Sequence, residues 1–214
     1  MPNLTVAVLA PQGYAKDLGK MGTTSDITFY NIKKGTTTVT FVEPTRYPEK
    51  LSSLFFSVSL AYTIVLVVDA IDAWFGECVL MLQCAGKTKG LIILRNFISP
   101  DQIAPLITGT VLEAYEVIGK DVGSLRESLL HEADRMAFRE KPLSSGSGGA
   151  VPVDHHYNVK GVGAVILGCV IRGLIKKHDT LQVLLTEKTA QVRSIQKHDD
   201  ETARHFPVTA SGSR

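Results

Sequence analysis

The stretch Val159-Lys160-Gly161-Val162-Gly163-Ala164-Val165-Ile166-Leu167-Gly168-Cys169-Val170-Ile171-Arg172-Gly173 decides the fold of the second part of the chain. Its residues alternate with a period of two, starting with Val159, Gly161 and Gly163 on one face, which is typical of a half-buried β-strand. Glycines within a strand pattern indicate bends or close backbone approaches. The stretch therefore predicts a pair of strands with glycines at the corners of a small barrel.

The spacing V-x-G-x-G-x-V-x-x-G-x-V-x-x-G in this stretch resembles the start of domain II in EF-Tu-type translation factors. The flanking segments 153–158, 174–181 and 192–196 agree with the resemblance. They are most similar to the archaeal SelB-like branch, which includes the factor called EF-Pyl. The resemblance implies a G domain before this β domain, GTP as a ligand and aminoacyl-tRNA as a partner.

Length, charge and cysteine content limit the number of domains and indicate the cellular compartment. A length of 214 residues fits one large domain or two modest ones, and a net charge of +2 gives no broad basic surface for nucleic acid. Cys78, Cys84 and Cys169 form no paired CxxC elements, which favours a reducing compartment. The N-terminus shows no signal-peptide pattern, and the apolar run 54–68 is shorter than the roughly 20 residues of a membrane span. We expect a cytoplasmic protein without a membrane partner.

Residues 1–140 predict a degenerate G-domain-like α/β domain, with a mainly parallel sheet wrapped by helices. Residues 141–150, rich in serine and glycine, predict a linker, and residues 151–214 a partial domain II β-barrel. Short apolar runs and segments of period 3.6 locate the elements of the first domain. Strands are expected at 4–9, 37–42, 63–68, 90–94 and 115–118, and helices at 48–58, 74–85 and 124–138.

A phosphate-binding loop, G-x-x-x-x-G-K-[ST], is expected after the first strand, because its backbone N–H groups hold phosphates at a helix N-terminus. The chain has Ala10-Pro11-Gln12-Gly13-Tyr14-Ala15-Lys16-Asp17 there, with a single glycine and no hydroxyl for Mg²⁺. Lys16 is the residue left to contact a phosphate, and the alternative is a shortened turn with a surface lysine. Gly86-Lys87-Thr88 spells the end of such a loop, but it follows a predicted helix, so Gly86 is predicted to end that helix.

The two switch motifs of the family are kept only in part. By resemblance, Thr24 stands where a threonine of switch I binds Mg²⁺, and the alternative is a polar turn before a strand. Glu43 stands where switch II has an aspartate that reaches Mg²⁺ through water, while Arg46 and Tyr47 replace a glycine and the catalytic histidine. A tyrosine with an ordinary pKa is a poor base at neutral pH. Hydrolysis by the family mechanism is therefore expected to be lost.

The two guanine-recognition motifs are reduced as well. In the first, Asn96 is the remaining polar candidate, and Phe97 replaces the aspartate that accepts hydrogen bonds from the base. In the second, Lys120 keeps the lysine whose stem stacks on the base. Each unpaired donor on the base would cost about 1–3 kcal/mol. We expect no catalytic residue, no metal site and no cofactor, with GTP and Mg²⁺ bound only if an altered loop still holds nucleotide.

The start of the barrel domain keeps more of its chemistry. The resemblance places Asp154, His155 and Tyr157 in the pocket for the amino acid carried by tRNA. The alternative is a strand of alternating surface and core residues. Adjacent strand residues point to opposite faces, which argues against His155 and His156 as a pair of metal ligands.

The predicted function is that of an elongation-factor-like protein that binds aminoacyl-tRNA, the ribosome or another translation partner. A functional translational GTPase and a pseudo-GTPase scaffold or regulator without an RNA ligand are the alternatives. Beyond residues 196–201 the barrel pattern weakens, and an unclosed barrel exposes strand edges. Self-association through these edges is a further expectation.

Overall fold

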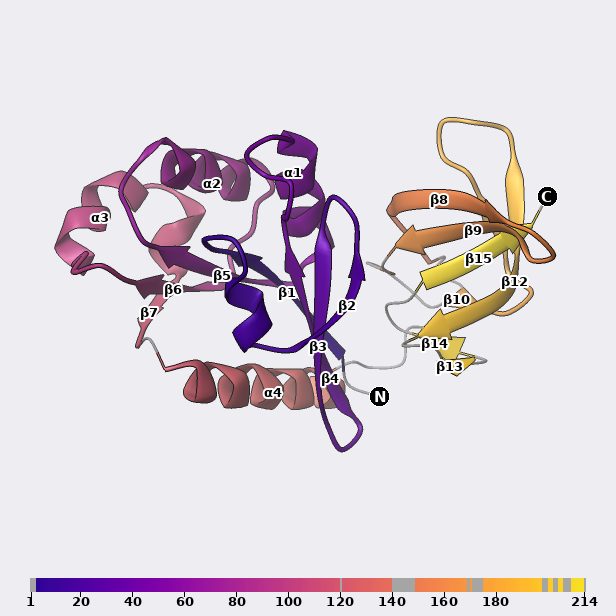
Figure 1. Cartoon of the computed structure of the whole chain (residues 1–214), viewed down its shortest axis with the longest axis horizontal. Helices are drawn as coiled ribbons and strands as arrows, with labels where there is room; N and C mark the ends of the chain where they lie inside the picture. The colour runs from indigo at the N-terminus through magenta and orange to yellow at the C-terminus, as the bar shows by residue number, and fades with distance from the viewer. Residues whose placement is uncertain are drawn as a thin grey trace. The chain divides into compact units, whose positions relative to one another are not determined.

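The computed structural model describes residues 3–119, 121–139, 149–168, 170, 175–197, 200–201, 204–205 and 209–213. Contacts within the chain divide it into two compact units, residues 1–139 and residues 140–214 (Figure 1). Most of the expected linker, residues 141–148, lies outside the described residues. The linker and the domain bounds derived from it stay predictions.

The first unit contains a seven-stranded sheet in the order β2-β3-β4-β1-β5-β6-β7. The five strands from β4 to β7 in this order are parallel, and β3 pairs antiparallel with both β2 and β4. This confirms the predicted α/β class with a mainly parallel sheet. The strands are β1 (Asn3–Leu9), β2 (Lys20–Thr24), β3 (Thr28–Lys34), β4 (Thr37–Glu43), β5 (Thr63–Val68), β6 (Gly90–Leu94) and β7 (Glu116–Ile118).

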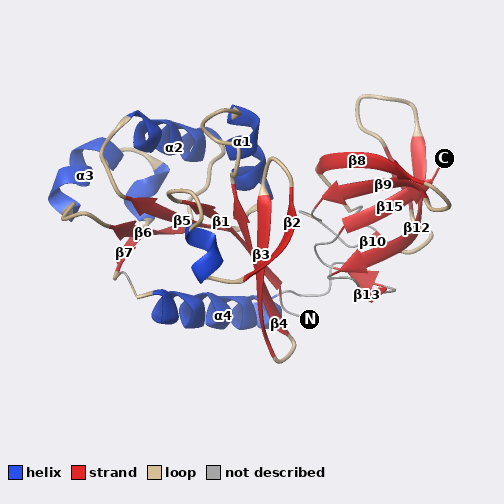
Figure 2. Cartoon of the chain, viewed as in Figure 1, coloured by secondary structure: helices blue, strands red, loops and turns tan. Residues whose placement is uncertain are grey.

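Helices cover both faces of this sheet (Figure 2). Ala7 and Leu9 of β1 pack with one group of helices, while Val6 and Val8 pack with α4 on the other face. Successive strand residues point to opposite faces, so strands covered on both sides need continuous apolar runs. The first group is α1 (Leu51–Leu60), α2 (Ala73–Cys84) and α3 (Pro100–Ile107); α4 is Val122–Arg139, and two short 3₁₀ helices are η1 (Tyr14–Asp17) and η2 (Val111–Ala114).

The predicted helices are found with one clear error of boundary. α1 was expected from Pro48 but begins at Leu51, because the Lys50 N–H bonds the Arg46 carbonyl (2.8 Å) and Lys50 has an extended backbone. The apolar run 54–68 forms the end of α1 and the wholly buried strand β5, as predicted. None of the helices in the described part of the chain is long and apolar enough to cross a membrane.

The second unit is a β domain. Its larger sheet has the order β11-β12-β15-β9-β8, with β13 paired to β12, and β10 pairs with β14. Ile175, Val192 and Ile195 are buried together in its core. The strands are β8 (Val153–Val159), β9 (Gly163–Gly168), β10 (Ile175–Lys176), β11 (Thr180–Gln182), β12 (Thr189–Lys197), β13 (Asp200–Glu201), β14 (Arg204–His205) and β15 (Thr209–Ser213).

The glycine-rich stretch forms the predicted strand pair, but its alternation does not run through one strand. Val159 ends β8 and pairs across a tight turn with Gly163, and Gly161 lies in the turn with a left-handed φ of 85°. The expectation that Val159, Gly161 and Gly163 share one face of a strand is therefore wrong. Gly168 is a close backbone approach, since a Cβ there would lie 2.3 Å from the Pro152 carbonyl oxygen. Cys169 and residues 171–174 lie outside the described residues.

Candidate functional site

The candidate site lies at the carboxyl edge of the first unit, the edge of the sheet where its parallel strands end. Open parallel sheets bind ligands at this edge. Loops after β1, β4, β5 and β6 meet there, and they bring Lys16, Glu43 and Asn96 to one edge. Thr24 reaches the same edge at the end of β2, opposite Thr28. Lys120 lies outside the described residues.

The loop after β1 lacks the helix that a phosphate-binding loop needs. Gly13 has a left-handed backbone (φ 88°), and the single 3₁₀ turn η1 follows it before β2 begins. A phosphate site uses the free N–H groups and the dipole at the start of a long helix. Lys16 lies in η1 with its side chain exposed. The loop is thus a shortened turn, and any phosphate contact from Lys16 stays a prediction.

Glu43 occupies the donors that remain in this loop. Its side chain is buried, and its Oε1 accepts hydrogen bonds from the N–H groups of Gly13 (3.0 Å) and Ala15 (3.4 Å). Its Oε2 accepts from the Tyr30 hydroxyl (3.1 Å). Burial, and then the charge of Glu43, raise the pKa of Tyr30 to about 12. Both carboxylate oxygens therefore have donors from the protein itself, and a link from Glu43 to Mg²⁺ stays a prediction.

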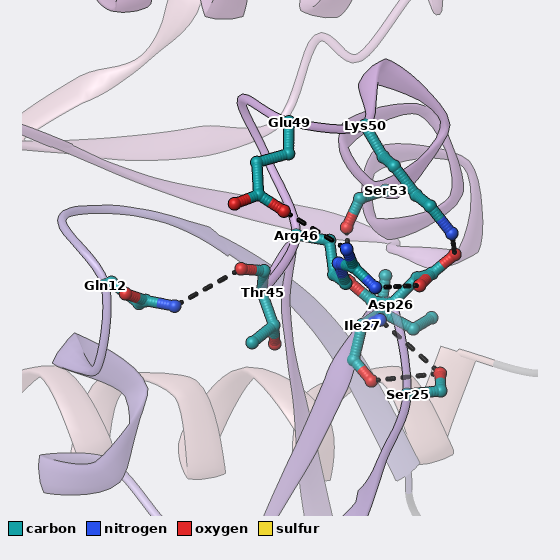
Figure 3. Close-up of polar contacts among 9 residues, drawn as sticks. All are labelled: Gln12, Ser25, Asp26, Ile27, Thr45, Arg46, Glu49, Lys50 and Ser53. Carbon is teal, nitrogen blue, oxygen red and sulfur yellow. Dashed lines mark hydrogen bonds and ion pairs between the residues drawn. The ribbon is translucent and has the colours of Figure 1, made fainter.

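The segment after Glu43 is bonded to the loop and to β3. The Thr45 and Thr28 hydroxyls lie 2.5 Å apart, and the Gln12 side-chain amide donates to the Thr45 carbonyl (3.3 Å). The Arg46 N–H donates to the Asp26 carbonyl (3.1 Å). Figure 3 shows the contact of Gln12 with Thr45 and the place of Arg46 beside Asp26. The segment in the place of switch II is therefore held at successive residues.

Asp26, in the turn between β2 and β3, is the centre of a charged cluster (Figure 3). Its carboxylate forms ion pairs with Lys50 Nζ (2.8 Å) and with Arg46 (4.0 Å), and Arg46 also pairs with Glu49 (3.2 Å). Its backbone carbonyl accepts a hydrogen bond from the Ser53 hydroxyl of α1. The segments in the places of switch I and switch II thus contact each other directly, through the ion pairs of Asp26 and the backbone hydrogen bond from Arg46.

Tyr47, which replaces the catalytic histidine, is directed into contacts with α2. Its hydroxyl donates to the Glu77 carboxylate, and its ring centre lies 6.2 Å from that of Trp74. Burial and the hydrogen bond with Glu77 raise the pKa of Tyr47 well above its usual range. A neutral hydroxyl that already donates to a carboxylate cannot take a proton from water at neutral pH.

The loop after β6 forms the other half of the carboxyl edge. The Asn96 side-chain amide donates to the Asp69 carbonyl (3.1 Å), and Arg95 Nε lies 3.4 Å from the Asp69 carboxylate. The guanidinium of Arg95 also lies 5.9 Å from the ring centre of Tyr14. Asn96 and Phe97 are both left-handed (φ 50° and 62°), and the Phe97 side chain is fully exposed. Phe97 stands where the resemblance expects an aspartate, and guanine recognition by this loop stays a prediction.

In the second unit, β8 carries the residues expected to line an aminoacyl pocket. A register shift separates Val153 and His155, and the Tyr157 side chain is 45% exposed. The side chains of Asp154 and His155 lie outside the described residues. Among the residues that the structure describes, no group of three His, Cys, Asp or Glu side chains could hold a metal ion. The aminoacyl pocket stays a prediction.

Gly86-Lys87-Thr88 forms a corner between α2 and β6, as predicted. Gly86 is left-handed (φ 62°), its N–H bonds the Gln83 carbonyl, and the Lys87 N–H bonds the Leu82 carbonyl, both at 3.1 Å. This pattern of bonds is a Schellman helix end. The Lys87 ammonium donates to the carbonyls of Ala61 (2.6 Å) and Ser59 (3.3 Å) at the end of α1, and burial lowers its pKa.

Two features of the site were missed by sequence reasoning. One is the bond of Glu43 to Tyr30, for which the signal is an acidic residue at the end of the apolar run 37–42. The other is the Asp26 cluster, for which the spacing of Arg46, Glu49 and Lys50 shows only the local pair. Partners that are distant in sequence carry no such signal.

No known protein-family model matches the chain. It is 35% identical to "Uncharacterized protein MJ0325" of Methanocaldococcus jannaschii over 218 residues, which cover 100% of this chain and 66% of that protein. It is 24% identical to the "Selenocysteine-specific elongation factor" of the same organism over 199 residues, covering 85% of this chain and 42% of that protein. The chain thus spans two thirds or less of the length of these relatives.

Solved structures show the same fold over both units. The SelB elongation factor from Methanococcus maripaludis, in complex with the GTP analogue GppNHp, superimposes with a TM-score of 0.74 at 18% identity, covering 100% of this chain and 52% of that one. A bacterial selenocysteine-specific elongation factor, EF-Sec, gives 0.72 at 18% identity, covering 99% and 42%.

The sheet, its helices and the following β domain define the class, which is the fold of translation elongation factors. Within that class, the chain is a relative of the SelB-like elongation factors. The predicted family relationship is confirmed. The narrower assignment to an EF-Pyl-like, archaeal member stays a prediction.

Proposed function

We propose that this chain is an elongation-factor-like protein of translation that acts by binding and does not pass through a GTP cycle. Its relationship to SelB-like factors supports a role in translation. Aminoacyl-tRNA, or another component of the translation machinery, is the partner that we propose for it. Tyr157, and with it Asp154 and His155, would contact the amino acid at β8.

The observation that carries the proposal is the direct bonding between the two switch-like segments. In a nucleotide-driven switch, γ-phosphate and Mg²⁺ contacts order such segments, and hydrolysis releases them. Here Asp26 bonds Arg46 and Lys50, so the same segments are ordered by protein contacts. We therefore expect the order of these segments not to depend on which nucleotide is present.

The nucleotide part of the proposal is tested by titrating the purified full chain with labelled GTP and GDP in the presence of Mg²⁺. We expect no saturable binding at micromolar nucleotide, since the phosphate loop and the base-reading aspartate are both absent. Each factor of ten in affinity corresponds to about 1.4 kcal/mol. Tight, guanine-selective binding would support a functional GTPase with an altered loop instead.

The ligand part is tested by comparing charged and uncharged tRNA at low and at moderate salt. If β8 contacts the amino acid, charged tRNA binds more tightly, and Tyr157→Ala removes that preference without weakening the binding of uncharged tRNA. Val183→Ala, a change on an exposed side chain outside β8, serves as the control. Equal affinities refute the aminoacyl pocket, and binding that only falls steeply with salt indicates phosphate contacts. No binding of either tRNA supports a scaffold that contacts a protein.

A further inference from the structure

The backbone of Gly13–Ala15 has the geometry of an anion-binding nest. Gly13 is left-handed (φ 88°, ψ 2°), and the right-handed turn η1 follows immediately. Successive N–H groups in such a sequence of conformations converge on one point, which suits an anion. In this chain the N–H groups of Gly13 and Ala15 converge on a single oxygen, Oε1 of Glu43. We call residues 13–15 the nest.

The carboxylate in the nest is buried and depends on hydrogen bonds. Glu43 is 3% exposed, and none of the described lysine, arginine or histidine side chains forms an ion pair with it. A buried charge is costly unless hydrogen bonds or a counter-charge replace its water. The two nest donors and the Tyr30 hydroxyl are the donors that do so here. The nest and the carboxylate therefore stabilise each other.

We propose that the nest is an oxyanion site that the protein fills with its own Glu43 carboxylate, in the place where a phosphate group would otherwise bind. This inference rests on the proposed function. It gives the structural reason why the loop after β1 would not bind the phosphates of a nucleotide. A phosphate cannot enter beside Glu43, because both N–H groups are used and the two anions would repel each other. When the Glu43 carboxylate is removed, the N–H groups of the nest should bind phosphate-like oxyanions.

The test uses the full chain and three substitutions at one position. Glu43→Ala opens space and frees the donors, Glu43→Gln keeps the shape without the charge, and Glu43→Asp keeps the charge on a shorter side chain. Glu49→Ala is the matched control, since Glu49 is an exposed acid of the same segment that pairs with Arg46. The probe is inorganic phosphate, compared with sodium chloride at equal ionic strength.

We expect about 50 mM phosphate to raise the unfolding midpoint of Glu43→Ala by about 3 °C or more, through preferential binding to the folded state. The native protein, Glu49→Ala, Glu43→Gln and Glu43→Asp should show no phosphate-specific rise. If Glu43→Ala folds but gains nothing, or if the native protein gains as much, the proposal is overturned.

A second measurement applies even if Glu43→Ala does not fold. In Glu43→Gln, the amide protons of Gly13 and Ala15 should move upfield in the NMR spectrum, because their acceptor loses its charge. Unchanged shifts would also overturn the proposal. Neither result affects tRNA binding, so failure here is distinct from failure of the proposed function.

Discussion

The carboxyl edge of the first unit has two halves that differ in how they are completed. Beside β1 and β4, the carboxylate of Glu43 is fully bonded and Asp26 is surrounded by cations. Beside β5 and β6, Asn96 and Phe97 both have a left-handed backbone, and the Phe97 side chain is fully exposed. Asp69 Oδ1 is buried there without a hydrogen bond among the described residues, and it forms an ion pair with Arg95 Nε (3.4 Å). One half is filled by bonded side chains, whereas the other carries an exposed apolar ring on a left-handed backbone.

The difference shows that one edge of a sheet can be completed in two ways, which we expect to have opposite effects on stability. Replacing a ligand by a side chain removes the need for that ligand and adds buried hydrogen bonds. Losing a recognising residue leaves the loop with its unusual backbone and gains nothing in return. Substitutions in the two halves should therefore change stability in opposite directions.

The largest expected effect is alkaline unfolding, which acts on the filled half. Burial, and then the charge of Glu43, raise the pKa of Tyr30 to about 12. Burial, and then the hydrogen bond with Glu77, also raise the pKa of Tyr47. A tyrosine whose folded pKa lies above its ordinary value of about 10 adds stability below pH 10, which is lost as the pH rises toward 12. Unfolding midpoints measured with tyrosinate absorbance should fall across this window. A flat profile between pH 10 and 12 would contradict the buried hydrogen bonds.

Tyr30→Phe should give the next largest effect. It removes one donor from the buried carboxylate of Glu43, and hydrogen bonds to charged groups contribute about 2 kcal/mol. Urea denaturation should show a loss of that order in the free energy of unfolding. Tyr62→Phe is the control, since the exposed Tyr62 hydroxyl accepts a hydrogen bond from the Lys89 ammonium (2.6 Å), and its loss should cost less than about 0.5 kcal/mol.

Asp26→Asn should cost about 1 kcal/mol at low salt and less at high salt, because its ion pairs are partly exposed and are screened. A double-mutant cycle with Lys50→Met measures the coupling within the cluster. Glu49→Gln, which removes only the exposed pair with Arg46, should lie within about 0.5 kcal/mol of the native protein. Strict additivity of Asp26→Asn and Lys50→Met would show that the cluster does not hold the two segments together.

The smallest effect is expected in the open half, and with the opposite sign. Phe97→Gly relieves a left-handed backbone but makes the unfolded chain more flexible, so a net gain of about 0.5 kcal/mol is expected. Phe97→Ala keeps the backbone strain and should change little. A loss of stability on Phe97→Gly would show that the ring makes contacts that stabilise the loop.

The buried elements of the first unit could be predicted because their apolar residues follow the period of the element. β5 is apolar at almost every position and is buried on both faces, so its pattern is plain. β2 and β3 were both missed. All five residues of β2 are exposed and show no alternation, and in β3 only Thr28 and Tyr30 are buried. α3 was missed because Pro105 lies inside it, although Ser99 and Gln102 form a capping box at its start.

The candidate site could be located but not completed from the sequence. The resemblance placed Glu43 and Asn96 in motifs that follow strands of the first domain, and the structure brings both to the edge where the parallel strands end. The partners of Glu43 are 13 to 30 residues away along the chain, and no local pattern connects them. Long-range pairs of this kind depend on sheet register and on loop length, which a single sequence does not specify.

The corner at Lys87 has a consequence for how sequences of this kind are searched. Gly86 ends a helix, Lys87 binds the end of another, and Gly90 has no room for a Cβ, which would lie 2.1 Å from the ring of Tyr115. Gly86, Lys87 and Gly90 thus each have a structural role in this corner. A short pattern ending in Gly-Lys-Thr will mark such corners in proteins without nucleotide sites, and the strand before the pattern and the helix after it are what separate the two.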